Sequence, residues 1–378
     1  MHCESRYAIR VTVTVKNCSA SLSRCLRRCR LAMRVRRDIK KTQHQRGYSR
    51  LSKDSVFPVT MIALVDRFEV TMNKRLVLLI FVSLLCTDGF AQTSPWPPSA
   101  DHVTLPLWPQ AAPGPSISTG PEIDTTTVKD RAVAGRRVIR IGNVSVPTLT
   151  LYKPTARNSG AAVVVFPGGS YKILAIDLEG TEVCDWLTSI GVRCVLVKYR
   201  VPDTGPYPKS AAALQDAQRA VGLVRSHAAE WHIDPKRIGV LGFSAGAHLS
   251  AALSTHFDKR LYDPIDAVDQ LSCRPDFAVI VYPGYLALAE QNFTSNPEIR
   301  VTEQTPPSFI VQAEDDPVHV ENSTVYFLAL KNAKVPAELH IYAEGGHGYG
   351  LRRTELPVTS WPQSVETWLR TIHMVESR

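Results

Sequence analysis

Residues 237–246 read Arg-Ile-Gly-Val-Leu-Gly-Phe-Ser-Ala-Gly, and this stretch decides the fold. Its first half, 237–241, is mostly apolar and indicates a buried strand, whereas the small residues of 245–253 indicate a helix. The pattern Gly-x-Ser-x-Gly joins the two, from Gly242 to Gly246. A turn this tight leaves no room for side chains at its flanking positions, and the two glycines meet that demand. We therefore expect Ser244 on a sharp turn at the end of a strand.

Ser244 is a candidate nucleophile in this setting. The turn would expose its hydroxyl above the sheet, and the N-terminus of the next helix would stabilise negative charge that develops there. A bare match to Gly-x-Ser-x-Gly is weak evidence, and the same residues could form a plain turn between a strand and a helix. The strand before the pattern and the helix after it favour the catalytic interpretation.

The rest of the chain alternates between strand-like and helix-like segments. Strands are predicted at Ala161–Phe166, Arg193–Lys198, Phe277–Tyr282, Phe309–Gln312 and Glu338–Tyr342, and helices at Gly180–Ile190, from Lys209 to about Trp231, at Ser323–Asn332 and near Pro362–Ile372. This order predicts an α/β fold with a mostly parallel central sheet and helices on both faces. Val138 to Tyr152 alternates around Asn143 and predicts an antiparallel edge hairpin, while Gly284 to Thr305 shows no clear element.

A serine nucleophile needs a base, and the base needs a carboxylate that orients it. His347 follows a predicted strand among three glycines, which allow a tight loop at the edge of the sheet, and His319 is its main rival. Asp315 and Asp316 both follow an earlier strand. We prefer Asp316 because it directly precedes a proline, although spacing alone does not separate the two. Serine, aspartate and histidine then occur in the order that the α/β-hydrolase fold requires.

Backbone donors for an oxyanion are expected after another strand. The oxyanion segment, residues 166–171, reads Phe-Pro-Gly-Gly-Ser-Tyr and follows the strand that ends at its first residue. Each N–H group aimed at a tetrahedral oxyanion stabilises it by roughly 3 to 4 kcal/mol. Gly168, Gly169 and Ser170 are the candidate donors, with Gly169 and Ser170 preferred, and the N–H of Ala245 completes the site. Taken alone, such a segment could be an ordinary loop.

The formal charge of +9 over 378 residues is unevenly distributed. Residues 1–71 contain 16 Lys/Arg and 5 Asp/Glu, whereas residues 92–378 contain 26 and 29. The basic surplus therefore belongs to the leader, and nucleic acid is not expected as a partner. With 44% apolar residues, the chain can bury a substantial core.

Residues 72–91 are typical of a secretory signal, with basic residues after Met72, a short apolar run from Leu76 to Cys86, and small residues before Gln92. The run is too short for a membrane span, which needs about 20 residues. Because a signal must lie at the N-terminus, the preceding residues 1–71 predict either a misplaced start codon or a basic extension. The mature protein is expected in the periplasm or outside the cell without a membrane anchor.

The mature chain is expected to comprise a Pro-rich irregular arm, residues 92–125, and a catalytic domain, residues 126–376. It keeps three cysteines, Cys184, Cys194 and Cys273. Their odd number and apolar surroundings indicate buried thiols rather than a disulfide framework. One pair could still form in an oxidising compartment.

The sequence resembles bacterial α/β-hydrolases related to acetyl xylan esterases and feruloyl-esterase-like enzymes. The resemblance covers roughly residues 105–375, and it is carried by Phe166–Tyr171, Lys198–Pro202, Asp234–His248, Asp315–Ser323 and Glu338–Leu351. It implies release of acetyl or hydroxycinnamoyl groups from plant polysaccharide outside the cytoplasm, without metal or cofactor. One departure is that the oxyanion segment has Pro-Gly-Gly-Ser where many lipase relatives have His-Gly-Gly-Gly.

Two other interpretations remain open. The first is a different hydrolase on the same fold, such as a lipase-like esterase or a peptidase, although no long apolar lid is evident. The second is a carbohydrate-binding protein without activity, which the filled triad positions disfavour. The expected partner is an ester, either a small molecule or a polysaccharide, and the oligomeric state is left open.

Overall fold

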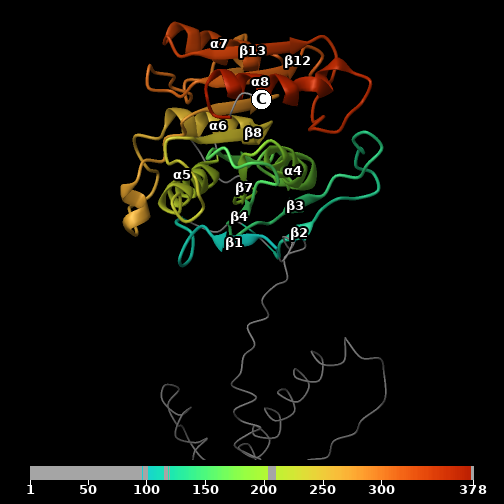
Figure 1. Ribbon diagram of the computed structural model, residues 1–378. Helices are drawn as coiled ribbons and strands as arrows, with labels where there is room; N and C mark the ends of the chain where they lie inside the picture. The colour runs from blue at the N-terminus through green and yellow to red at the C-terminus, as the bar shows by residue number, and fades with distance from the viewer. Residues whose placement is uncertain (1–95, 97–100, 115–117, 119, 203–209, 376–378) are drawn as a thin grey trace, which may run out of the picture. The chain divides into compact units, whose positions relative to one another are not determined.

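The computed structural model describes residues 96, 101–114, 118, 120–202 and 210–375 (Figure 1). Among these residues, eight strands form the central sheet in the order β1-β4-β7-β5-β8-β9-β12-β13. The strands of this sheet are β1 (Val103–Pro106), β4 (Thr148–Tyr152), β5 (Ala162–Phe166), β7 (Arg193–Lys198), β8 (Ile238–Phe243), β9 (Ala278–Val281), β12 (Ser308–Ala313) and β13 (Ala337–Tyr342). The α-helices are α4 (Glu182–Ser189), α5 (Ala211–Ser226), α6 (Ala245–Thr255), α7 (Glu321–Asn332) and α8 (Trp361–Thr371).

Six neighbouring strands, from β7 to β13, are parallel, while β1 and β4 pair antiparallel at one edge. A parallel strand at the centre of such a sheet is buried on both faces, which explains why β5 is apolar and buried throughout. The α/β fold with a mostly parallel sheet is thus confirmed. Its carboxyl ends lie at one edge, where Phe166, Phe243 and Ala313 each lead into a loop.

Helices cover both faces of the sheet. Successive side chains of a strand point to opposite faces. A side chain at Gly242 would meet α6 at Ser250, whereas the next residue, Phe243, packs its ring against Trp361 of α8 at 5.9 Å. Helix α5 packs on α6, and Trp186 of α4 packs on Trp361 at 5.4 Å. Helices α4 and α8 therefore share one face, and α5 and α6 share the other.

The predicted hairpin over Val138–Tyr152 is wrong. β3 (Arg140–Gly142) pairs with β2 (Ile123–Asp124) and β6 (Ile173–Ala175) in a separate sheet, whereas β4 joins the central one. Asn143 has a φ of +58°, and the chain turns there from one sheet to the other. The alternating pattern indicated two strands correctly, but it holds no information about which strand each of them pairs with.

The Pro-rich arm is not wholly irregular, contrary to prediction. Its strand β1 extends the central sheet by pairing Val103–Pro106 with β4. Directly afterwards, the indole of Trp108 is buried and donates to the carboxylate of Asp216 on α5 at 2.8 Å. Arg219 of the same helix donates to the carbonyl of Leu107 at 3.0 Å. Residues 103–108 are therefore part of the folded domain.

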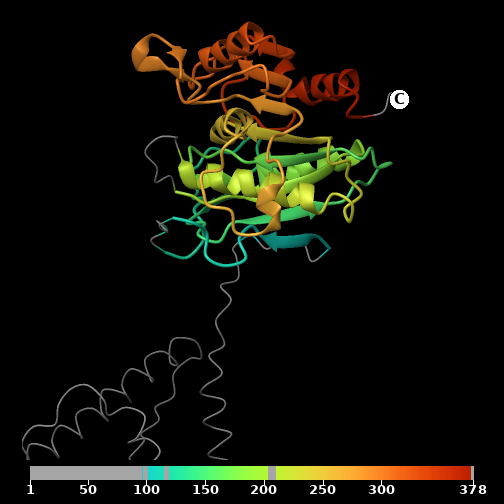
Figure 2. The same cartoon turned by 90° about the vertical axis from the view of Figure 1, so that its left-hand side faces the viewer.

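The segment Gly284–Thr305, predicted without an element, contains a short antiparallel pair. Strands β10 (Ala287–Leu288) and β11 (Thr294–Ser295) form it, and it is drawn in orange in Figure 2. The carboxamide of Asn322 on α7 accepts hydrogen bonds from the N–H groups of Leu286 and Ala287, at 2.8 and 2.9 Å. This contact anchors the pair to the helix.

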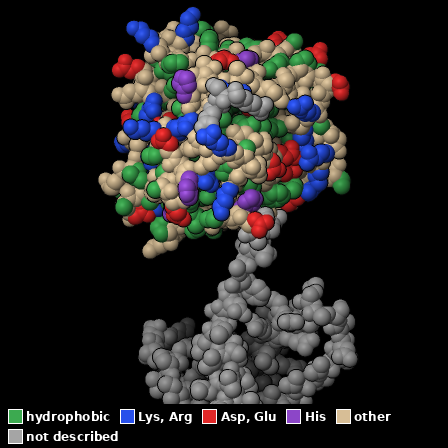
Figure 3. All heavy atoms as spheres, viewed as in Figure 1, with side chains coloured by type: hydrophobic (Ala, Val, Ile, Leu, Met, Phe, Trp, Pro, Cys, Tyr) green, Lys and Arg blue, Asp and Glu red, His purple; other side chains and the backbone are tan. Residues whose placement is uncertain are grey.

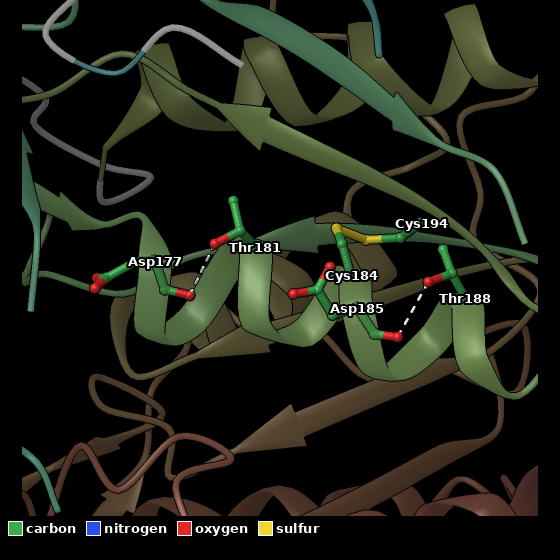
Figure 4. Close-up of a disulfide and its surroundings, with 6 residues drawn as sticks. All are labelled: Asp177, Thr181, Cys184, Asp185, Thr188 and Cys194. Carbon is green, nitrogen blue, oxygen red and sulfur yellow. Dashed lines mark hydrogen bonds between the residues drawn. A yellow bond between two sulfur atoms is a disulfide. The ribbon is translucent and has the colours of Figure 1, made fainter. Parts of the chain in front are cut away.

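Two of the three cysteines are joined by a disulfide, contrary to the expectation of buried thiols. Figure 4 shows Cys184 of α4 bonded to Cys194 of β7, with their Cα atoms 5.1 Å apart. Helix α4 runs back over the strand that follows it, and this packing brings the two side chains together. Cys273 remains a buried thiol, as predicted.

The signal peptide at residues 72–91 and the basic extension at 1–71 lie outside the described residues. Across residues 101–202 and 210–375, apart from the short gaps already given, no helix is both long and apolar enough to cross a bilayer. On the face of the domain seen in Figure 3, basic and acidic side chains are interspersed.

Candidate active site

Ser244 lies on the sharp turn between β8 and α6. Its φ and ψ are +52° and −116°, a conformation that L-residues rarely adopt. The turn is closed from both sides by backbone. A Cβ atom on Gly242 would lie 2.0 Å from the carbonyl oxygen of Gly246, and one on Gly246 would lie 2.0 Å from that of Phe166. The two glycines are therefore required by close approach of the chain.

The three predicted triad side chains form one hydrogen-bonded chain. His347 Nε2 lies 2.8 Å from Ser244 Oγ, and His347 Nδ1 lies 2.8 Å from Asp316 Oδ2. The acid is buried, with 4% of its surface exposed, while the imidazole is partly accessible. An imidazole that donates through Nδ1 to a carboxylate presents its Nε2 lone pair to the serine hydroxyl. This geometry suits removal of a proton from Ser244.

The geometry separates Asp316 from Asp315. Asp316 Oδ1 also accepts from the N–H of Val318 at 2.7 Å, and its Oδ2 accepts from the amide of Gln312 at 2.9 Å. These donors hold the carboxylate toward the imidazole. Asp315 instead accepts from the N–H of Gly346 at 2.7 Å, so it contacts the loop that carries the histidine and not the ring.

His319, the rival base, packs its ring on Phe293 at 5.0 Å instead. Its backbone N–H donates to the carbonyl of Asp316 at 2.9 Å, so it contributes to the turn that carries the acid. Of the two histidines, the structure brings only His347 to the serine.

The oxyanion segment turns sharply beside the nucleophile. Gly169, Ser170 and Tyr171 have consecutive positive φ values of +137°, +56° and +58°. Ala245 is the first residue of α6, and the N–H groups of a first helical turn have no partner within the helix. The N–H groups of Gly169, Ser170 and Ala245 are therefore the candidate oxyanion donors.

Gly168 is not such a donor, which corrects one prediction. Its N–H donates to the carboxylate of Glu179 at 2.6 Å in the interior. A Cβ atom on Gly168 would lie only 2.9 Å from that of Ser244 and 2.6 Å from the carbonyl oxygen of Phe243. Gly168 thus allows close approach of the segment to Ser244, while its N–H is taken up by Glu179.

Glu179 and Tyr282 were missed by the sequence reasoning. The buried Glu179 carboxylate accepts from the Tyr282 hydroxyl at 2.9 Å as well as from Gly168. Burial raises the pKa of Glu179, and the hydrogen bonds from Tyr282 and Gly168 oppose that rise. In the sequence Glu179 lies between Asp177 and Glu182, so nothing distinguishes it from its acidic neighbours, and its partner Tyr282 is 103 residues away.

Aromatic rings line the surroundings of the triad. The ring of Tyr282 packs edge-on against the His347 imidazole with centroids 5.0 Å apart, and Tyr349 packs on Tyr282 at 4.5 Å. On the α6 side, the Tyr171 hydroxyl and His248 Nδ1 lie 2.7 Å apart in the interior. His248 is thus part of a buried hydrogen bond behind the turn and lies outside the triad.

Comparison with known proteins places the chain among hydrolases. A family model described as the alpha/beta hydrolase fold matches residues 163–303. The chain is also similar to an acetyl ester-xyloside bifunctional hydrolase from Caldicellulosiruptor lactoaceticus, whose crystal structure is known. The two sequences are 34% identical, and the two structures superpose with a TM-score of 0.57. That match covers 72% of this chain and 97% of the other.

Two curated relatives are also similar. An acetylxylan esterase of Xylanibacter ruminicola is 31% identical over 240 residues, which are 57% of this chain and 46% of the relative. A carboxylesterase of Mycobacterium tuberculosis is 25% identical over 269 residues, which are 62% of this chain and 79% of the relative. The chain therefore spans less than half the length of the acetylxylan esterase.

Proposed function

This chain belongs to the α/β-hydrolase family of carboxylic-ester hydrolases, and from that premise we propose that it is a serine esterase acting through Ser244, His347 and Asp316. The observation that carries the proposal is the unbroken hydrogen-bonded chain from the serine hydroxyl through the imidazole to the buried carboxylate. The three side chains lie at the carboxyl edge of the parallel sheet, and this fold places its catalytic residues at that edge.

In the proposed reaction, His347 Nε2 takes the proton of Ser244 as the serine oxygen attacks the ester carbonyl. The negative charge that develops on the carbonyl oxygen is stabilised by the N–H groups of Gly169, Ser170 and Ala245. The tetrahedral intermediate collapses, the alkoxy group leaves with the proton held by the imidazole, and an acyl-serine remains. Water then attacks the acyl group with the same base, which releases the carboxylic acid and restores Ser244.

We propose an acetylated carbohydrate, such as acetyl xylan, as the substrate class. The support is the similarity to two named hydrolases, an acetylxylan esterase and an acetyl ester-xyloside bifunctional hydrolase. Feruloyl esters of the same polysaccharides are the next class to test. A general carboxylesterase is the second candidate, because the carboxylesterase of Mycobacterium tuberculosis aligns over most of its own length.

The test compares wild type with Ser244→Ala on nitrophenyl acetate, acetylated xylan, a feruloylated sugar and a prolyl peptide. Loss of the nucleophile should lower kcat by roughly 10⁴-fold or more, since removal of any triad member leaves only the residual effect of the oxyanion donors. Ester turnover that survives in Ser244→Ala would refute the nucleophile assignment. Peptide cleavage without ester turnover would replace the esterase with a peptidase.

We also propose that the enzyme works outside the cytoplasm. Residues 72–91 have the pattern of a secretory signal. The Cys184–Cys194 disulfide supports the proposal, because structural disulfides persist in oxidising compartments. N-terminal sequencing of the native protein should give a mature chain that begins near Gln92, and a chain that begins near Met1 contradicts this.

A further inference from the structure

Glu179 lies between the two halves of the site. One carboxylate oxygen, Oε2, accepts the N–H of Gly168 in the oxyanion segment at 2.6 Å. The other, Oε1, accepts the hydroxyl of Tyr282 at the end of β9 at 2.9 Å. Only 4% of the Glu179 surface is exposed, so both contacts are shielded from water.

Tyr282 extends the contact to the catalytic histidine. Its ring packs edge-on against the His347 imidazole, with centroids 5.0 Å apart and an interplanar angle of 64°. Its hydroxyl accepts the N–H of Gly350, three residues after His347, at 3.2 Å. Tyr282 itself has a φ of +37°, which is unusual for a bulky residue. A displaced Tyr282 would therefore shift both the ring and the loop of His347.

Gly168 extends the contact to the oxyanion donors. It precedes Gly169 and Ser170 directly, and its backbone is packed against Ser244 and the carbonyl of Phe243. A hydrogen bond that holds the N–H of Gly168 thus restricts the direction in which the next two N–H groups point. Misplacing such groups by about 1 Å can lower a rate by roughly 100-fold.

We propose that Glu179 is a positioning residue, whose carboxylate sets the oxyanion segment and, through Tyr282, the base of the same active site. This proposal rests on the proposed esterase function. Both donors to the carboxylate are neutral, and a buried carboxylate with neutral partners is costly compared with apolar packing. Its two coplanar acceptors bridge donors from two loops, which an apolar side chain cannot do.

The variant Glu179→Gln tests the proposal with little change in volume. An amide accepts through only one of its two ends. Its NH₂ group therefore either opposes the N–H of Gly168 or donates to the Tyr282 hydroxyl, which must then accept this bond besides the one from Gly350 and can no longer donate to residue 179. We expect kcat on nitrophenyl acetate to fall roughly 10- to 100-fold while KM stays within about twofold. The rate at which a fluorophosphonate labels Ser244 should fall similarly, because labelling also develops charge at the oxyanion donors.

Asp269 provides a control carboxylate away from the triad. This buried carboxylate also accepts from a tyrosine hydroxyl and a backbone N–H, those of Tyr262 at 2.7 Å and Ile265 at 3.0 Å. Unlike Glu179, it is also ion-paired with Arg219, at 3.1 Å. It lies in the short helix Ala267–Gln270, which packs on α5 and contacts none of the triad residues. We expect Asp269→Asn to lower the Tm but to leave kcat within about twofold of wild type.

The outcomes separate the two proposals. A wild-type protein that neither hydrolyses esters nor reacts with the fluorophosphonate contradicts the esterase function. An active wild type with an equally active, folded Glu179→Gln variant overturns the positioning role alone, as does an equal loss of kcat in Asp269→Asn. If Glu179→Gln does not fold, Tyr282→Phe decides. It keeps the bond between Glu179 and Gly168 and the ring beside His347, and it removes the hydroxyl that joins Glu179 to the N–H of Gly350. Its kcat should fall several-fold at unchanged KM, and wild-type kcat there overturns the proposal.

Discussion

Two neighbouring carboxylates have different tasks in this site. Asp316 is buried and contacts the imidazole, whereas Asp315 accepts only a backbone N–H of the histidine loop. Asp316→Asn should lower kcat by roughly 10⁴-fold, since an amide favours the wrong tautomer of His347. Asp315→Asn should lower it by less than roughly tenfold, because only one loop contact is weakened. Steady-state kinetics on nitrophenyl acetate compares the two, and equal losses would contradict the division of roles.

The residues of the candidate site could be predicted only where the order of residues in the chain or the glycines of a turn mark them. Ser244 and His347 are marked by glycines on both sides, which few other functions require. The choice between Asp315 and Asp316 depends on burial, which spacing does not encode. The N–H of Gly168 is not free for the oxyanion because it donates to Glu179. Glu179 is bonded in turn to Tyr282, 103 residues away, and no local sequence pattern could reveal that pair.

The disulfide joins a helix to the strand that follows it. Cys184 and Cys194 are separated by ten residues, and a cross-link of that span should stabilise the fold by about 2 to 3 kcal/mol through loss of unfolded-state entropy. The double variant Cys184→Ala/Cys194→Ala should therefore unfold at a lower temperature than wild type. A reductant should lower the Tm of wild type to the same extent and leave that of the variant unchanged. A double variant that unfolds at the wild-type temperature would contradict the stabilising role.

Elements were predicted more reliably than their partners. The predicted bounds of β5, β7, β8 and β12 differ from the observed ones by at most two residues, because burial on both faces leaves a continuous apolar signal. The predicted edge hairpin was wrong because the sequence pattern does not show which strands pair. An alternating sequence looks the same whichever neighbour the strand pairs with, and here β4 pairs with a strand from the arm.

The arm is packed onto the domain through Trp108, so we expect the two to unfold together. The buried indole donates to Asp216, and the guanidinium groups of Arg200 and Arg219 lie over its ring, 5.9 and 5.8 Å from the centroid. Trp108→Ala should lower the free energy of unfolding by about 3 to 5 kcal/mol. Val128→Ala, at a fully exposed site, should change it by less than about 0.5 kcal/mol. Urea unfolding compares them, and similar values would show that the arm is dispensable.

The twisted backbone of Ser244 has an evolutionary consequence. A residue with a side chain at this φ is held there against its own conformational preference, so glycine at position 244 would relax the turn while removing the hydroxyl. A change of Ser244 to glycine would then raise the stability of the fold and abolish its activity. A lineage released from the need to hydrolyse its substrate would gain from discarding its serine first, and inactive descendants of this fold should be recognisable by that loss.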